Sequence, residues 1–318
     1  MPRRSTKQKA KKGLDGLTSR QKAKQSLINQ KDKPKQKPLK TRKPMETKLP
    51  YADLDLKHWR DYEHIETSSL WLWENRDRRD GHQNDYHGNC VPQILTQLLS
   101  RYTKKGDAIL DLFLGSGTSA IEAVNLGRQA VGVELQSEMV DYVQQKLDNQ
   151  GKSNHVRIIQ GDSSDLIQTS KKIETSLAQL GKEQAQFSFL HPPYADIIQF
   201  SEQEACLSNT DSTEAFLEQF EAVAEQAYRH LEPGRFAGLV IGDKYAKGEW
   251  IPLGFYCLER MNRVGFKTKS IIVKNMAGNE KGKGRQANLW RYRALKGGFY
   301  IFQHEYVMLF QKELNSKK

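Results

Sequence analysis

The sequence predicts an α/β fold in which a mostly parallel sheet is covered by helices on both faces. Short apolar runs typical of strands alternate with helical patterns between residues 92 and 311, and strands separated by helices run parallel. A Gly-rich turn joins the first strand of this region to the next helix. Acidic residues follow successive strands, at the sheet edge where open α/β sheets bind ligands.

The helices are recognised by their apolar faces and end signals. A helix over 91–102 has Pro92 in its first turn, and its apolar face is Ile94, Leu95, Leu98 and Leu99. Helices are also expected at 119–126, 138–147 and 213–230, and the last is clearly amphipathic. The strands are expected at 108–113, 129–135, 155–160, 187–190, 236–241, 268–274 and 305–311.

A nine-residue stretch begins inside the first strand and contains the Gly turn: Leu110-Asp111-Leu112-Phe113-Leu114-Gly115-Ser116-Gly117-Thr118. Its glycines let a ligand approach the backbone where a side chain would clash. The second strand ends at Glu134, seventeen residues after Gly117, where a carboxylate is placed to accept hydrogen bonds from ribose hydroxyls. The turn and this acid together predict a nucleoside cofactor.

A second motif, His191-Pro192-Pro193-Tyr194, follows the strand at 187–190. With the Gly turn it resembles the S-adenosylmethionine-dependent DNA amino-methyltransferases of the adenine-N6 and cytosine-N4 type. That family pairs Asp-x-Phe-x-Gly-Ser-Gly-Thr with an (Asp/Asn/Ser)-Pro-Pro-Tyr loop. The resemblance covers roughly residues 87–312. It implies a Rossmann-like class I methyltransferase fold with a mostly parallel seven-stranded sheet, helices on both faces and an antiparallel last strand.

The same resemblance implies a binding site for S-adenosylmethionine. In it Asp111 meets the methionine amino group, Glu134 the ribose hydroxyls and Asp162 the adenine amine, although Asp162 is alternatively a turn residue after Gly161. The implied cofactor-binding residues are Asp111, Phe113, Gly115, Ser116, Gly117, Thr118, Glu134 and Asp162. The loop before the first helix offers three further candidates for cofactor binding, His87, Asn89 and Pro92. The alternative is a loop capped by small polar residues.

The resemblance assigns methyl transfer by direct in-line attack to His191, Pro192, Pro193 and Tyr194. Acceptors at the first loop position and the Pro192 carbonyl would hold the base amine, and Tyr194 would stack on a base extruded from the duplex. His191 departs from the family's Asp, Asn or Ser. A neutral imidazole accepts a hydrogen bond and takes up a proton, whereas an imidazolium does not. The alternative is a loop residue held by a backbone contact.

The positive charge of the chain is concentrated at its start. The formal net charge is +12, and residues 1–50 contain 17 Lys and Arg against 3 Asp and Glu, so the remainder is close to neutral. We expect residues 1–50 to form a disordered basic tail, which is either an arm that binds polyanions or a solubilising extension. The other expected domains are an aromatic and charged segment, 51–86, packed on a catalytic domain, 87–318. The arginines near its end, Arg76, Arg78 and Arg79, either belong to a surface network or contact phosphate.

The stretch 278–293 reads as a long, basic and aromatic loop between the last two strands. It either contacts nucleic acid or is merely solvated. The candidate nucleic-acid-binding residues are Lys281, Lys283, Arg285, Arg291 and Arg293. The nearby Phe299, Phe302 and Tyr306 either clamp the base or belong to the core.

The function expected from these motifs is methylation of a DNA base amino group, as in restriction-modification systems. The alternatives are an RNA base methyltransferase and a catalytically inactive nucleic-acid-binding protein of the same fold. Three cysteines without metal-type spacing, no apolar run long enough for a membrane span and no secretory signal predict a cytoplasmic protein without a metal. The sequence leaves the oligomeric state open, and we expect no separate target-recognition domain between the two motifs or after the last strand.

Overall fold

The computed structural model describes residues 48–79, 82, 89–194, 203, 205–246, 248–276 and 287–314. The chain divides into two units, Met1–Glu46 and Thr47–Lys318. Nearly all of the predicted basic tail therefore lies outside the described residues. No helix within the described ranges has the length and apolar character that crossing a lipid bilayer requires.

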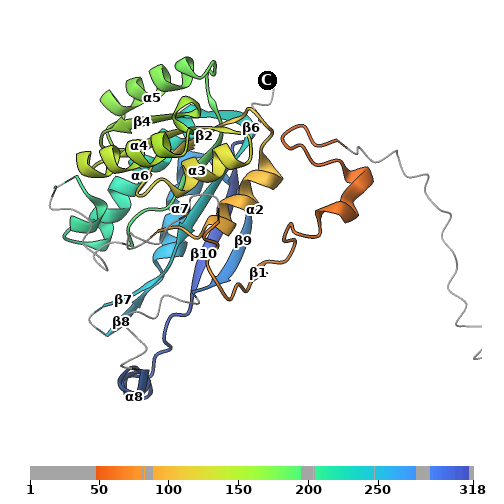
Figure 1. Cartoon of the computed structure of the whole chain (residues 1–318). Coiled ribbons are helices and arrows are strands. Elements are labelled where there is room, and N and C mark those ends of the chain that lie inside the picture. The colour runs from red at the N-terminus through yellow and green to blue at the C-terminus, as the bar shows by residue number, and fades with distance from the viewer. Residues whose placement is uncertain are drawn as a thin grey trace, which may run out of the picture. The chain divides into compact units, whose positions relative to one another are not determined.

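The described part of Thr47–Lys318 is built on an eight-stranded sheet with the order β1-β9-β10-β6-β5-β2-β3-β4 (Figure 1). The strands are β1 (Leu70–Trp71), β2 (Ala108–Asp111), β3 (Gln129–Glu134), β4 (Val156–Gln160), β5 (Ala185–Leu190), β6 (Leu231–Ile241), β9 (Lys267–Asn275) and β10 (His304–Gln311). Only β10 runs antiparallel to its neighbours in this sheet, β6 and β9. The predicted Rossmann-like class I methyltransferase fold, with its antiparallel last strand, is confirmed.

The predicted number of seven strands is wrong by one. The additional strand, β1, pairs in parallel with β9 through Leu70↔Val273 and Trp71↔Lys274. Two residues are too few to show a period-2 pattern, and this pairing exists only because the edge of β9 is available to it. Trp71 is fully covered in the core, whereas Leu70 is exposed.

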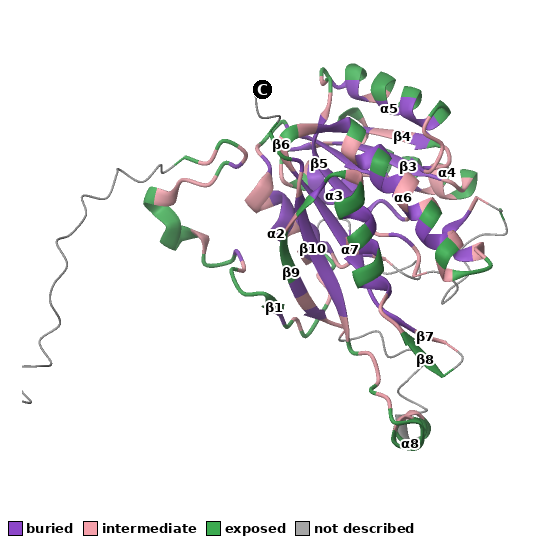
Figure 2. Cartoon of the chain, turned by 180° about the vertical axis from the view of Figure 1, so that it is seen from behind, coloured by how far each residue is buried: buried purple, intermediate pink, exposed green. Residues whose placement is uncertain are grey.

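Two helical layers cover the sheet, and each has its own hydrophobic cluster (Figure 2). The helices α2 (Pro92–Tyr102), α3 (Thr118–Asn125) and α4 (Ser137–Asn149) pack on one face. The helices α5 (Gln168–Gln179), α6 (Thr213–His230) and α7 (Leu253–Val264) pack on the other. The sequence prediction missed α5 because two of its four buried residues are polar, Thr169 and Ser170. It also missed α7, whose buried set includes Gly254 and Arg260.

The predicted loop at 278–293 is wrong in its second half, which is helical. Helix α8 covers Ala287–Gly297, while Lys281, Lys283 and Arg285 lie outside the described residues. The described side chains of α8 are mostly exposed. The buried stripe from which amphipathic helices are recognised is therefore missing. A short hairpin of β7 (Lys244–Ala246) and β8 (Glu249–Ile251) was not predicted either.

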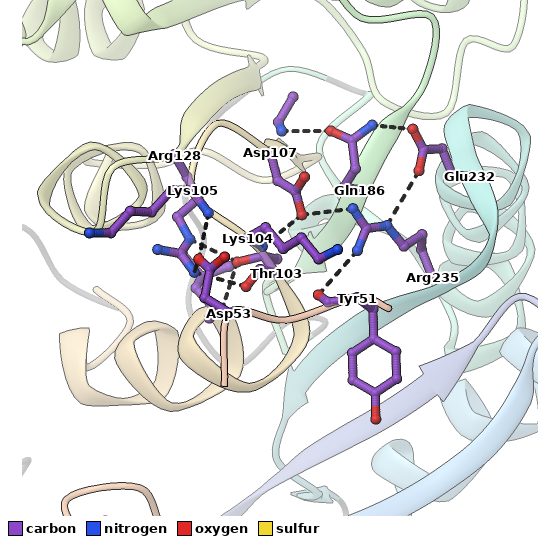
Figure 3. A network of polar contacts seen from close by, with 12 residues as sticks. Tyr51, Asp53, Thr103, Lys104, Lys105, Asp107, Arg128, Gln186, Glu232 and Arg235 are labelled. Carbon is purple, nitrogen blue, oxygen red and sulfur yellow. Dashed lines mark hydrogen bonds and ion pairs between the residues drawn. The ribbon is translucent and has the colours of Figure 1, made fainter. Parts of the chain in front are cut away.

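Residues 51–53 are bound at the amino-terminal edge of the sheet by a polar network (Figure 3). Arg235 donates to the Tyr51 carbonyl at 3.1 Å and to Asp107 at 2.7 Å. Arg128 and Asp53 form an ion pair of 3.4 Å. From here the chain passes through β1, which runs parallel to β9 toward the opposite edge of the sheet. The segment 51–79 thus runs from the amino-terminal ends of the parallel strands toward their carboxyl ends.

Candidate active site

The turn between β2 and α3 is held in shape by backbone hydrogen bonds. Leu114 N–H donates to the Val133 carbonyl at 3.0 Å, and Gly117 N–H donates to the Leu114 carbonyl at 3.0 Å. Gly115 and Gly117 have φ values of 50° and 79°, a region that side chains disfavour. Thr118 begins α3 directly after Gly117. The first backbone N–H groups of this helix therefore face a tight loop, as anion- and nucleotide-binding turns require.

We expect Gly117→Ala to destabilise the protein more than Gly106→Ala. Both glycines have φ of +79°, but a Cβ on Gly117 would lie 2.7 Å from Val143 Cγ1, whereas a Cβ on Gly106 meets nothing within 4 Å. The left-handed conformation costs each variant roughly 1–2 kcal/mol. Overpacking against α4 should add about 1–3 kcal/mol at Gly117 alone. Urea denaturation of both variants measures the difference, and equal losses would mean that α4 absorbs the added methyl.

Asp111 is a buried carboxylate at the carboxyl end of β2. Its Oδ1 accepts from Phe113 N–H at 2.9 Å, and its Oδ2 accepts from the Ser119 hydroxyl. Loss of solvation raises the pKa of Asp111 to about 6, against the lowering effect of these two donors. Phe113 is half-buried and packs against the core. An acid whose charge is poorly solvated at neutral pH is suited to receive a cationic ligand group.

Glu134 lies at the end of the neighbouring strand, β3, and points back to the Gly turn. Its Oε2 accepts from Gly115 N–H at 2.8 Å, and its Oε1 accepts from Gln136 N–H at 3.0 Å. Burial raises the pKa of Glu134, and the two backbone donors oppose this. The contact with Gly115 joins the acid and the turn into one rigid unit.

Asp162 lies after β4, the next strand along the same edge. Its Oδ1 accepts from Ser164 N–H at 2.8 Å and from the Ser164 hydroxyl at 2.7 Å. Its Oδ1 thus supports a turn, and the role of Asp162 in cofactor binding stays a prediction. Because β2, β3 and β4 are adjacent, Asp111, Glu134 and Asp162 follow one another along the carboxyl edge.

Asn89 and Ser116 bring the loop before α2 onto the Gly turn. The Ser116 hydroxyl donates to Asn89 Oδ1, and Arg76 Nη1 donates to the Asn89 carbonyl at 3.1 Å. Asn89 Nδ2 is buried and has no hydrogen-bond partner among the described residues. A buried amide N–H₂ of this kind calls for an acceptor. His87 lies outside the described residues, and Pro92 opens α2.

The His191-Pro192-Pro193-Tyr194 loop lies beside the Gly turn. It follows β5, which pairs directly with β2, and Leu112 N–H donates to the Phe189 carbonyl at 3.2 Å. Parallel neighbours end at the same edge. The structure thus places both motifs at adjacent strand ends, on the same edge as the three acids.

Tyr194 is fixed by a buried ion pair that the sequence prediction did not identify. Its hydroxyl donates to Glu305 Oε2 at 2.8 Å, and Glu305 Oε1 accepts from Lys274 Nζ at 2.9 Å. Lys274 and Glu305 are register partners on β9 and β10 and are 4% and 8% exposed. On its other side the Tyr194 ring rests on Gly242, where a Cβ would come within 3.0 Å of Tyr194 Cε2.

The only sequence signals for the Lys274–Glu305 pair are a lysine at the end of the strand predicted at 268–274 and a glutamate at the start of the strand predicted at 305–311. Their contact depends on the antiparallel register of β9 and β10, which sequence patterns do not give. Tyr306, by contrast, is a core residue: it is buried and donates to Asp243 at 3.1 Å. Phe299 and Phe302 contact the β7–β8 hairpin instead.

His191 is half-buried beside Tyr194, with 3.4 Å between its Nε2 and the Tyr194 hydroxyl oxygen. Since that hydroxyl donates to Glu305, it can only accept from His191. Nε2 therefore carries the hydrogen, and Nδ1 is left as an acceptor. Desolvation lowers the pKa of His191, aided by Lys274 and Arg76 and opposed by Glu305. The imidazole is thus neutral at neutral pH.

Two family models match the sequence of this chain. The family model described as "Conserved hypothetical protein 95" matches residues 91–250, half of the chain. The chain belongs to this family. A second model, described as "DNA methylase", matches residues 5–145. This match begins well before residue 87, where the resemblance was expected to start.

Several curated relatives are named type II methyltransferases. The chain is 32% identical to the type II methyltransferase M.BglI of Bacillus subtilis over 99 residues, which is 31% of this chain and 26% of the relative. It is 34% identical to the type II methyltransferase M2.DpnII of Streptococcus pneumoniae over 61 residues, 19% of this chain and 23% of the relative. The matched part thus spans about a quarter of these relatives. The predicted resemblance to DNA amino-methyltransferases is confirmed.

Among solved structures, TrmN from Thermus thermophilus is similar, with a TM-score of 0.47 and 15% identity over 74% of this chain and 52% of that one. A methyltransferase from Pyrococcus furiosus has a TM-score of 0.43 and 16% identity over 72% of this chain and 88% of that one.

Proposed function

We propose that the chain methylates an exocyclic amino group of a DNA base, adenine or cytosine, with S-adenosylmethionine as the donor. The observation that carries the proposal is the pairing of β2 with β5, since it sets the Gly turn and the His-Pro-Pro-Tyr loop at adjacent strand ends. A methyl donor held by one turn would then meet a base amine held by the other. The match of residues 5–145 to the family model described as "DNA methylase" supports the choice of DNA.

The residues at the Gly turn fit the proposed cofactor. Asp111 would pair with the methionine ammonium, Glu134 would accept from the ribose hydroxyls, and Asp162 would accept from the adenine amine. Asn89 Nδ2, which is buried without a partner among the described residues, would donate to the methionine carboxylate. The turn backbone from Phe113 to Thr118 would border the nucleoside. When bound, the cofactor supplies a methyl group already activated on a sulfonium.

The His-Pro-Pro-Tyr loop would bind and orient the target base. His191 Nδ1 and the Pro192 carbonyl would accept from the two amine N–H groups, and Pro193 stiffens the loop because its φ is fixed. Tyr194 would stack on the base, and its ring is already immobilised between Gly242 and Glu305. The proton that leaves the amine nitrogen would pass to His191 Nδ1. Holding the reactants in line supplies most of the rate gain in such transfers.

The rate of methyl transfer should fall in acid as His191 becomes protonated, because an imidazolium accepts neither a hydrogen bond nor a proton. Desolvation places the pKa of His191 below its ordinary value of 6.5, so we expect a plateau through neutral pH and a falling limb below about pH 6.5. Single-turnover rates at saturating donor and DNA measure this limb. His191→Asn should remove it, and the same acid limb in the wild type and in His191→Asn would rule out the role.

The proposed function is tested with a radiolabelled methyl donor on duplex DNA, single-stranded DNA and total RNA in parallel. Label in the amino group of a DNA base is the expected result. Label in RNA alone would select the RNA methyltransferase alternative. Donor binding without label in any polymer would select the inactive binding protein.

We further propose that the basic tail, residues 1–50, raises the affinity for nucleic acid without choosing a sequence. Its charge is the observation behind this role, since 17 cations oppose 3 acids. Deleting residues 1–45 should weaken duplex binding at least tenfold at low salt and flatten its salt dependence. An unchanged salt slope would leave the tail without a role in binding.

A further inference from the structure

We infer that α8, supported by the β7–β8 hairpin, docks on duplex DNA beside the target base and determines which sequence is methylated. This rests on the proposed function and addresses what that function leaves open, the origin of target choice.

The hairpin begins at the candidate active site. Gly242 and Asp243 join the end of β6 to β7, and Gly242 supports the Tyr194 ring. Asp243 Oδ1 accepts from Gly254 N–H at 3.0 Å, and its Oδ2 accepts from the Tyr306 hydroxyl at 3.1 Å. The base of the hairpin is thus fixed to α7 and to β10. Whatever binds the hairpin is held in a defined relation to Tyr194.

Two aromatic contacts attach the chain that leaves α8 to the hairpin. Phe299 stacks on Tyr245 with ring centroids 4.4 Å apart, and Phe302 contacts Trp250 at 4.2 Å. Tyr245 and Trp250 are register partners, so their side chains share one face of the hairpin. Phe299 N–H also donates to the Ala294 carbonyl at 3.2 Å, which joins this segment to the last turn of α8. Figures 1 and 2 both show α8 beside the hairpin.

The surface of α8 suits a polyanion. The helix contains Arg291, Arg293 and Lys296 and no acidic residue, and all three cations are exposed. Tyr292, between the arginines, is 60% exposed. A helix of eleven residues is marginal in water without a packed face, so a binding partner would stabilise α8. Cations contact phosphates, and a helix of this kind fits the major groove, where base edges are read.

The choice of duplex DNA over a protein partner rests on charge complementarity. A second copy of the chain would have to face three cations, whereas DNA offers a phosphate to each. Leu289 and Leu295 are exposed on the same helix and supply apolar contacts, for instance to thymine methyl groups. The hairpin keeps this surface at a fixed place relative to the base-binding loop.

The test compares Arg291→Ala/Arg293→Ala with wild type on a duplex library of randomised sequence, with methylated positions read by sequencing. The control, Lys171→Ala/Lys269→Ala, removes two exposed cations outside α8. We expect the α8 variant to bind duplex DNA at least tenfold more weakly, to lower the salt slope by about 2, and to lose or change the methylated motif. Donor affinity by calorimetry should stay as in wild type, and the control should change none of these.

An α8 variant with wild-type DNA affinity and an unchanged motif would overturn the inference. A Leu295→Glu variant that dissociates a dimer while DNA binding stays intact would also overturn it, in favour of a second copy as the occupant. Failure of the proposed function gives a different result, in which the wild-type protein binds the donor but methylates no DNA at all.

Discussion

Glu305→Ala is expected to lower the free energy of unfolding by about 3–5 kcal/mol, because it leaves the Lys274 ammonium buried without its partner. Lys274 Nζ lies 2.9 Å from Glu305 Oε1, and their side chains are 6% and 11% exposed. The substitution also removes the carboxylate that accepts the hydrogen bond from the Tyr194 hydroxyl. Chemical denaturation and single-turnover methyl transfer should both change strongly.

The structure offers a matched control for this pair. Lys267 and Glu313 also lie 2.9 Å apart, but both are 63% exposed. Glu313→Ala should therefore cost less than about 1 kcal/mol, as exposed ion pairs usually do. A large loss at Glu313 would mean that burial does not explain the effect at Glu305.

The double variant Lys274→Met/Glu305→Met separates stability from function. Replacing a buried ion pair by apolar side chains is often neutral or stabilising, so most of the lost stability should return. Methyl transfer should stay low, since the Tyr194 ring is no longer held by its hydroxyl. Recovery of both properties would show that Glu305 contributes stability only and does not position Tyr194.

Asp111→Asn is expected to weaken binding of S-adenosylmethionine about 10- to 100-fold, the loss of one charge-assisted hydrogen bond of roughly 1.5–3 kcal/mol. Calorimetry measures this affinity. Asp141→Asn, which changes an exposed acid on α4, should leave it unchanged. Equal affinities for Asp111→Asn and wild type would remove Asp111 from the cofactor site.

The same substitution should stabilise the protein in the absence of the donor. Burial raises the pKa of Asp111 from 3.8 to about 6. The folded state therefore holds the proton more tightly than the unfolded state, and stability is lost as the pH rises between these values. The loss amounts to about 3 kcal/mol at most. Asparagine has no charge to desolvate, so the melting temperature at pH 7 should rise while donor affinity falls, a trade-off typical of functional residues.

Donor affinity should follow the same ionisation. The wild-type protein should bind S-adenosylmethionine more tightly as the pH rises through about 6, where Asp111 becomes the anion that pairs with an ammonium. This limb belongs to binding and should be absent in Asp111→Asn. The His191 limb belongs to the transfer rate at saturating donor and should persist in that variant. The two assignments can therefore be tested independently.

By itself the sequence determined the alternation of strands and helices and the parallel sheet, because apolar periodicity and Gly turns are local signals. It also supplied both motifs, Asp111 to Thr118 and His191 to Tyr194, along with the acids after β3 and β4. Their meeting at one edge was predictable since the carboxyl ends of parallel strands coincide.

Tertiary structure alone decided what supports those motifs. The Lys274–Glu305 pair depends on antiparallel register, and Asn89 and Ser116, 27 residues apart in the chain, meet only in the folded structure. β1 and α8 also escaped prediction, because a two-residue strand and an exposed helix have no buried periodicity. Local patterns record which face of an element is buried, whereas contacts between distant segments depend on how the finished sheet brings them together.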